Sequence, residues 1–113
     1  MKKDPRVYLQ DILEAIQRIR SYRGLSRENF FTDFLLQDGV IRQISVIGEA
    51  SSKLSAEVKD RHSEIPWKKI IGMRNIVVHD YSQIKLDRVW ETVEEDLPEL
   101  SKAVQEVIQE LEG

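Results

Sequence analysis

The sequence contains no cysteine, so the chain has neither a disulfide framework nor thiolate chemistry. It has no apolar run that approaches the roughly 18 residues needed for a membrane-spanning helix. Its first five residues also lack the apolar segment of a secretory signal. We therefore expect a cytoplasmic protein that does not associate with a membrane.

Groups that commonly bind metals or carry catalysis are scarce. The two histidines are His62 and His79, and they are too few for a zinc site, which usually takes about three or four protein ligands. The chain has no glycine-rich phosphate loop and no nucleophile-elbow pattern around a serine. The sequence therefore predicts no metal site and no cofactor.

Charged residues, by contrast, are abundant: they make up 33% of the 113 residues, beside 41% hydrophobic residues. This balance is typical of a soluble globular protein, and the length predicts one domain over residues 1–113. The net charge of −3 argues against a protein that coats nucleic acid through bulk positive charge. Residues 59–74 hold five basic and two acidic side chains, which indicates either a local basic patch near Arg74 or an ordinary solvated surface.

Five glycines, three prolines and apolar side chains spaced three or four apart predict a nearly all-helical chain. A first helix should begin near Asp4, which can cap it, with Pro5 at its first position. Gly24 should end it. Its apolar stripe consists of Leu9, Ile12, Leu13, Ile16 and Ile19.

A second helical region should be capped by Ser26 and continue as a long helix to about Leu54. We expect a cluster of three phenylalanines to anchor its start in the core, and a kink or break at Gly39. The predicted buried stripe of the long helix is Val40, Ile44, Ile47, Ser51 and Leu54. The phenylalanines are Phe30, Phe31 and Phe34.

A neighbouring face of the long helix carries small and polar residues. Gly48 and the serines beside it would let another helix approach closely. Glu49 lies on this face, where it would either hydrogen-bond Arg74 or Asn75 or remain solvated.

Further helices should follow. Ser55 can cap a short helix over 56–61, and Pro66 should open another that continues through Val78. The last helix should begin at Lys85 or Asp87 and be kinked or split by Pro98. Four or five helices joined by short loops predict an all-α, antiparallel bundle.

Residues 74–81 read Arg-Asn-Ile-Val-Val-His-Asp-Tyr and concentrate the groups that could carry chemistry. The guanidinium of Arg74 offers a planar fork of donors for phosphate oxygens. The imidazole of His79 can move protons near neutral pH. Because RNA carries its own nucleophile, the 2′-hydroxyl, such a pair suffices for RNA cleavage without a metal.

Spacing alone does not bring the pair together. On an unbroken helix Arg74 and His79 lie about 140° apart, so either the helix ends near His79 or a second subunit completes the site. A plain structural interpretation is also open, in which Arg74 pairs with Asp80 or Glu49 and His79 caps a helix end.

The pattern Arg74-x4-His79-x-Tyr81 resembles the RX4–6HXY motif of HEPN-domain toxins, specifically the HepT-like ribonucleases. The resemblance extends beyond the motif. Residues 40–50 are similar to the mid-chain helix of that family, residues 65–75 to the approach to its motif, and residues 89–98 to its last helix.

This resemblance implies an antiparallel bundle of HEPN type and a homodimer whose two motifs line one cleft. It implies a metal-independent RNase toxin in which Arg74 and His79 are the catalytic pair and Asn75 and Asp80 are supporting polar neighbours. It further implies a partner, a nucleotidyltransferase antitoxin of the MntA type, which adds AMP to Tyr81 and so blocks RNA from the cleft.

Two other functions stay open at this stage. HEPN domains also occur as non-catalytic modules that dock a nucleotidyltransferase, and the acidic last helix would then serve as the docking surface. A plain helical bundle without a site is the third alternative.

Overall fold

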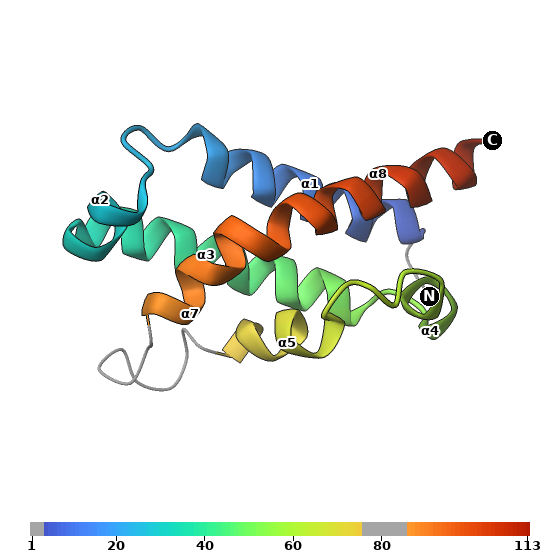
Figure 1. Ribbon diagram of the computed structural model, residues 1–113. Helices are drawn as coiled ribbons and strands as arrows, with labels where there is room; N and C mark the ends of the chain where they lie inside the picture. Colours follow the sequence, from blue (N-terminus) through green and yellow to red (C-terminus); the bar gives the residue numbers. More distant parts are fainter. Residues whose placement is uncertain (1–3, 76–85) are drawn as a thin grey trace.

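The computed structural model describes residues 4–75 and 86–113, and all regular structure in these two ranges is helical (Figure 1). The expectation of an all-α protein is thereby confirmed. In chain order the elements are α1 (Pro5–Ser21), α2 (Arg27–Thr32), α3 (Phe34–Ser52), α4 (Ala56–Arg61), α5 (Trp67–Gly72), the 3₁₀ turn η1 (Met73–Asn75), α7 (Leu86–Glu91), the π-helical turn η3 (Thr92–Asp96) and α8 (Leu97–Glu112).

Helix α1 begins where the sequence predicts. The Asp4 carboxylate accepts a hydrogen bond from the backbone N–H of Arg6 at 2.9 Å, and Pro5 occupies the first turn, where no N–H is needed. The helix ends at Ser21, earlier than expected. Gly24 instead belongs to the turn that follows, where its φ of 73° is a conformation that favours glycine.

The junction between α2 and α3 differs from the expectation. Ser26 caps α2 as predicted, but Asp33 ends that helix and caps α3 by accepting a hydrogen bond from the N–H of Leu35 at 2.9 Å. This break turns the first residues of α3 outward. Phe30 is fully buried, whereas Phe34 is 78% exposed, so the prediction that Phe34 anchors the core is wrong.

Helix α3 continues without a break through Gly39. A Cβ at Gly39 would lie 3.0 Å from the ring of Tyr22, so the glycine leaves room for that ring to pack on the helix. The helix thus tolerates the weak propensity of Gly39, and the expected break is absent.

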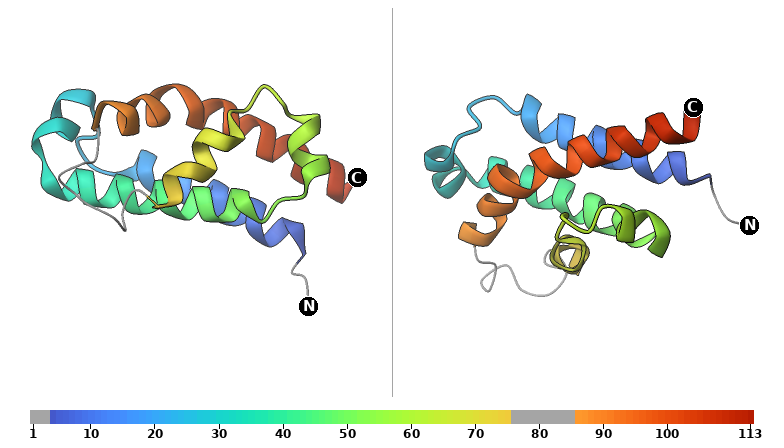
Figure 2. Two further views of the ribbon diagram at one scale, coloured as in Figure 1. Left: turned by 90° about the horizontal axis from the view of Figure 1, so that it is seen from below. Right: turned by 45° about the vertical axis from the view of Figure 1, so that its right-hand side comes forward.

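The helices alternate in direction around one hydrophobic core (Figure 2). Helices α1 and α3 run antiparallel, α5 packs on α3, and α8 packs along α1. The stripe predicted for α3 is buried: Val40, Ile44, Ile47, Ser51 and Leu54. In the described ranges, no helix has both the length and the apolar character to cross a membrane.

The C-terminal region is interrupted where the sequence indicates. Pro98 lies in the first turn of α8, and the turn just before it, η3, is π-helical. Pro98 has no N–H to donate to the carbonyl four residues earlier, so regular α-helix cannot continue through this point. The prediction that Pro98 kinks or splits the last helix is confirmed.

Candidate functional site

Arg74 lies in η1, directly after α5, at the end of the first described range. The sequence predicts one helix from Pro66 through Val78, but the α-helix ends at Gly72 and the chain tightens into a 3₁₀ turn. The expectation of an unbroken α-helix at Arg74 is therefore wrong. This turn lies directly against α3 and accepts a hydrogen bond from Ser45 there.

The contact between η1 and α3 is close and involves the backbone. A Cβ on Gly48 would lie 2.7 Å from the carbonyl oxygen of Ile70 and 3.0 Å from the backbone nitrogen of Arg74. The hydroxyl of Ser45 donates a hydrogen bond to the carbonyl oxygen of Arg74 at 2.8 Å. The prediction that Gly48 and its neighbouring serines admit another helix is confirmed, and it is the Arg74 segment that fills the space.

Glu49, on the same face of α3, contacts the Arg74 side chain. Its Oε2 lies 3.6 Å from Nη1 of Arg74, and Lys53 approaches the other carboxylate oxygen at 3.7 Å. The side chains of Arg74 and Glu49 remain 38% and 58% exposed. The contact that the sequence suggests between Glu49 and Arg74 is present, as a loose ion pair at the surface.

The remaining candidate residues fall outside the described ranges. His79, Asp80 and Tyr81 belong to residues 76–85, and the side chain of Asn75 is likewise outside. The meeting of Arg74 with His79 therefore stays a prediction, as do the roles of the other three residues.

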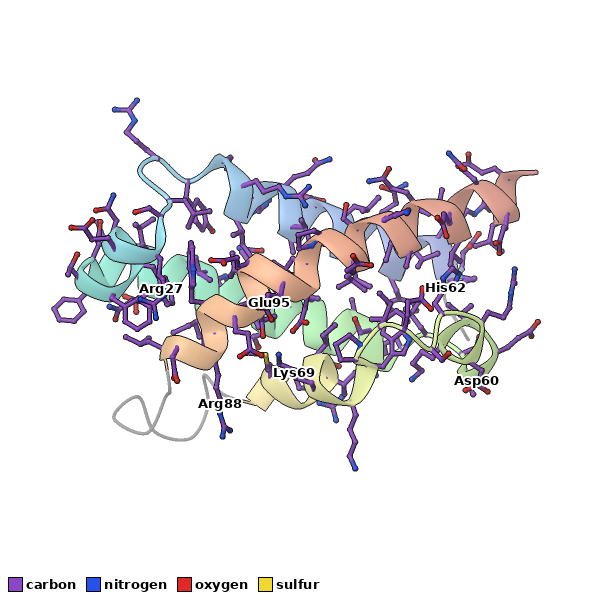
Figure 3. The ribbon with its side chains drawn as sticks, in the orientation of Figure 1. Arg27, Asp60, His62, Lys69, Arg88 and Glu95 are labelled. Atoms are coloured by element: carbon purple, nitrogen blue, oxygen red, sulfur yellow. The ribbon has the colours of Figure 1, made fainter. Side chains whose placement is uncertain are left out.

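One ionic cluster near the site was missed by sequence reasoning. The ammonium of Lys69, a residue labelled on α5 in Figure 3, lies 2.7 Å from Glu91 and 2.8 Å from Asp96. It thereby bridges α5 to the α7–η3 segment. Burial alone would lower the pKa of Lys69, but its hydrogen bonds to both carboxylates outweigh burial and raise that pKa. The only sequence signal was Pro98, which fixes the wide turn that presents Asp96.

The basic segment 59–74 is largely neutralised by such pairs. Arg61 pairs with Glu110, Lys69 with its two carboxylates, and Arg74 with Glu49. Among the residues that the structure describes, Lys59 and Lys68 are the cations of this segment without a carboxylate within ion-pair distance. The local basic patch is therefore smaller than the sequence suggests.

Metal ligands do not gather anywhere in the described ranges, where no group of three His, Asp or Glu side chains is arranged to hold an ion. The described part of the site holds one arginine, Arg74, whose backbone packs closely against α3 and whose guanidinium is partly open to solvent. Such a group can bind a phosphate or a carboxylate.

Comparison with known proteins assigns the chain to a family. The family described as ribonuclease HepT-like matches residues 12–107. A protein of Thermococcus cleftensis named "Probable ribonuclease HepT" is 40% identical over 88% of this chain and 92% of its own length. The mRNA nuclease HepT of Shewanella oneidensis is 27% identical over 82% of this chain and 87% of its own length.

A longer relative from Methanocaldococcus jannaschii, whose name joins a gamma-glutamylcyclotransferase with a candidate RNase, is 39% identical over 99% of this chain. The chain spans about half, 51%, of the length of that relative. No solved structure gives a significant match. The family match and these identities over most of the chain show that it belongs to the HepT-like ribonuclease family.

Proposed function

We propose that this chain is a metal-independent RNase toxin of a toxin–antitoxin pair, and that it cleaves RNA with Arg74 and His79. The observation that carries the proposal is family membership over residues 12–107 combined with an intact Arg74-x4-His79-x-Tyr81 motif. The Shewanella oneidensis relative, which is named an mRNA nuclease, supports RNA as the substrate class.

Arg74 suits the role of the phosphate ligand. Its side chain is 38% exposed, so a phosphate can reach the guanidinium without a large rearrangement. The 3.6 Å separation from Glu49 is longer than a tight charge-assisted hydrogen bond, which measures about 2.8 Å. An RNA phosphate that accepts two hydrogen bonds from the guanidinium can therefore displace Glu49.

In the proposed reaction the ribose 2′-oxygen attacks the adjacent phosphorus, and its proton passes to the imidazole of His79. The bond from phosphorus to the 5′-oxygen of the next nucleotide breaks, and that oxygen takes up a proton from water as it leaves. His79 then returns its own proton to the solvent. The products are a 2′,3′-cyclic phosphate and a 5′-hydroxyl end. Arg74 stabilises the charge that builds on the phosphorane oxygens, while Asn75 and Asp80 orient the pair.

A homodimer would supply both motifs to one cleft, which answers the spacing problem of Arg74 and His79. In the same proposal a nucleotidyltransferase of the MntA type transfers AMP from ATP to the phenol oxygen of Tyr81, with loss of pyrophosphate. The added phosphate would lie near Arg74 and repel the RNA backbone. Both RNA cleavage by this chain and its inactivation by AMP transfer would take place in the cytoplasm.

The direct test compares RNA cleavage by purified wild type with cleavage by Arg74→Ala and His79→Ala. Loss of a charge-stabilising donor or of a general acid–base group is expected to slow cleavage about 10²–10⁴-fold. Arg20→Ala is the matched control, since Arg20 is an exposed arginine at the far end of α1. Activity in either motif variant equal to that of Arg20→Ala would contradict the assignment.

Modification of Tyr81 is tested by mass spectrometry after co-expression with the nucleotidyltransferase. We expect added AMP on wild type, none on Tyr81→Phe, and no RNA cleavage by the modified protein. A wild type that cleaves no RNA and yet binds the transferase would instead identify a non-catalytic docking module.

A further inference from the structure

A groove separate from the Arg74 site opens between α4 and the start of α5. It has a volume of about 860 Å³, and its apolar wall is formed by Ile65, Pro66 and Trp67. Lys59 and Lys68 lie at its borders. Asp60, labelled on α4 in Figure 3, is the one acidic residue among those that line it.

Trp67 is held in place by its own donor. The indole N–H donates to the carbonyl oxygens of Lys59, at 3.1 Å, and His62, at 3.0 Å. The indole is partly buried and packs against the core, so its orientation is fixed before any ligand binds. Because its only polar atom is already satisfied, Trp67 offers the groove an apolar aromatic surface and no hydrogen bond.

The charges of the groove suit an anion. Lys68 is exposed and Lys59 is partly exposed, and neither has a carboxylate within ion-pair distance among the described residues. Lys69 also lines the groove, but its ammonium is bound to Glu91 and Asp96. Two available ammonium groups beside an aromatic surface match the alternation of phosphates and bases in a single-stranded nucleic acid.

The groove lies within reach of the Arg74 site along one helix. Trp67 and Arg74 are seven positions apart in the chain, so the two lie roughly 10 Å apart along the axis of α5 and η1. A strand whose scissile phosphate lies at Arg74 would pass the groove a few nucleotides away.

We infer that this groove is a second RNA-binding subsite, in which a base stacks on Trp67 and flanking phosphates contact Lys59 and Lys68. The inference rests on the proposed function, since it extends the path of the same RNA. The groove would then select single-stranded RNA by its length and charge and not by its base sequence.

The test measures binding of single-stranded RNA of about ten nucleotides, a length typical of single-strand sites, to full-length protein that carries Arg74→Ala to prevent cleavage. In that background, Lys59→Gln with Lys68→Gln should weaken binding about tenfold and lower the salt slope by about 0.7 per lost phosphate contact. Lys102→Gln, an exposed lysine on α8, is the matched control and should change neither.

Two further variants guard against misfolding as an explanation. Asp60→Asn removes the acidic residue and should tighten RNA binding, a gain that an unfolded protein cannot give. Trp67→Phe keeps an aromatic ring and should bind more tightly than Trp67→Leu. A dinucleotide is too short to reach from Arg74 to the groove. Wild type and a Lys59→Gln, Lys68→Gln variant that retains Arg74 should therefore cleave it at equal rates.

RNA binding and a salt slope unchanged in the double lysine variant would overturn the inference, whatever the catalytic result. If the same variant instead loses affinity for the nucleotidyltransferase while binding RNA normally, the groove is a protein-docking site and the inference is wrong. Wild type that binds RNA through the groove but does not cleave it would overturn the proposed activity and leave the subsite standing.

Discussion

Replacement of Gly48 by alanine tests the close approach that positions Arg74. The new Cβ would lie 2.7 Å from the carbonyl oxygen of Ile70 and 3.0 Å from both the nitrogen and the Cβ of Arg74. Two of these three atoms are backbone atoms, so relief requires α5 and η1 to move away from α3. Overpacking of this kind costs about 1–3 kcal/mol.

The opposing effect is helix propensity. Alanine is favoured over glycine inside a helix by about 1 kcal/mol. Since the clash is with backbone, the upper part of the overpacking range applies, and the net destabilisation of Gly48→Ala should be about 1–2 kcal/mol. For a chain of 113 residues this lowers Tm by about 4–8 °C.

Gly72 provides the matched control. It is the last residue of α5, it is exposed, and a Cβ there would meet no atom within 4 Å. Gly72→Ala should therefore stabilise the protein by up to about 1 kcal/mol through reduced freedom of the unfolded chain. Thermal unfolding followed by circular dichroism checks both variants, and a Tm for Gly48→Ala at or above that of Gly72→Ala would refute the packing described here.

Three other predictions concern stability. Phe30→Ala should cost about 3–5 kcal/mol because the side chain is fully buried, whereas the exposed Phe34→Ser should change stability by less than about 0.5 kcal/mol in urea unfolding. The folded-state pKa of Lys69 is raised above 10.5, so its charged contacts stabilise the fold fully below pH 10.5. This stabilisation is lost as pH rises through the folded-state pKa. The difference in Tm between wild type and Lys69→Met should therefore shrink in that range. Hydrogen bonds from the Arg6 side chain and backbone lower the pKa of the Asp4 carboxylate from 3.8 to about 2. The stabilisation by this carboxylate is present above pH 3.8 and is lost as pH falls through 2. The Tm of wild type should therefore fall more than that of Asp4→Asn between these two pH values.

The local features of the fold could be predicted from the sequence. Asp4, Ser26 and Ser55 each accept a hydrogen bond from the first turn of the helix that they precede, as expected from their residue types. These signals work because cap and helix are within a few residues of each other, so no tertiary information is needed. The face of small residues around Gly48 could also be predicted, since the apolar residues of that helix recur at regular three- and four-residue spacing.

Features set by distant parts of the chain could not be predicted in this way. The exposure of Phe34 follows from a local signal, the Asp33 cap of α3. By contrast, the ring of Tyr22, 17 residues earlier, packs where a Cβ on Gly39 would lie. The turn η1 likewise packs against α3, where Ser45 donates a hydrogen bond to the carbonyl oxygen of Arg74. These two contacts join residues 17 and 29 positions apart, so residue type and local spacing do not reveal them.

The candidate site shows the same division. The phosphate-binding role of Arg74 is a prediction from its residue type and from the family resemblance, and the approach of Glu49 was predicted from the face of the long helix on which it lies. The cluster around Lys69 does not, because its two carboxylates come from a segment more than 20 residues later and are aligned only by the turn before Pro98.

The backbone of Arg74 and its guanidinium are held by different contacts. Its backbone is fixed by the close contact with Gly48 and the hydrogen bond from Ser45, which bury no charge. Among the described residues its guanidinium pairs with the exposed carboxylate of Glu49, and exposed pairs contribute little to stability, about 0–1 kcal/mol. We therefore expect an RNA phosphate to replace Glu49 at little cost in stability, whereas Gly48→Ala should shift the guanidinium whatever its charge partner.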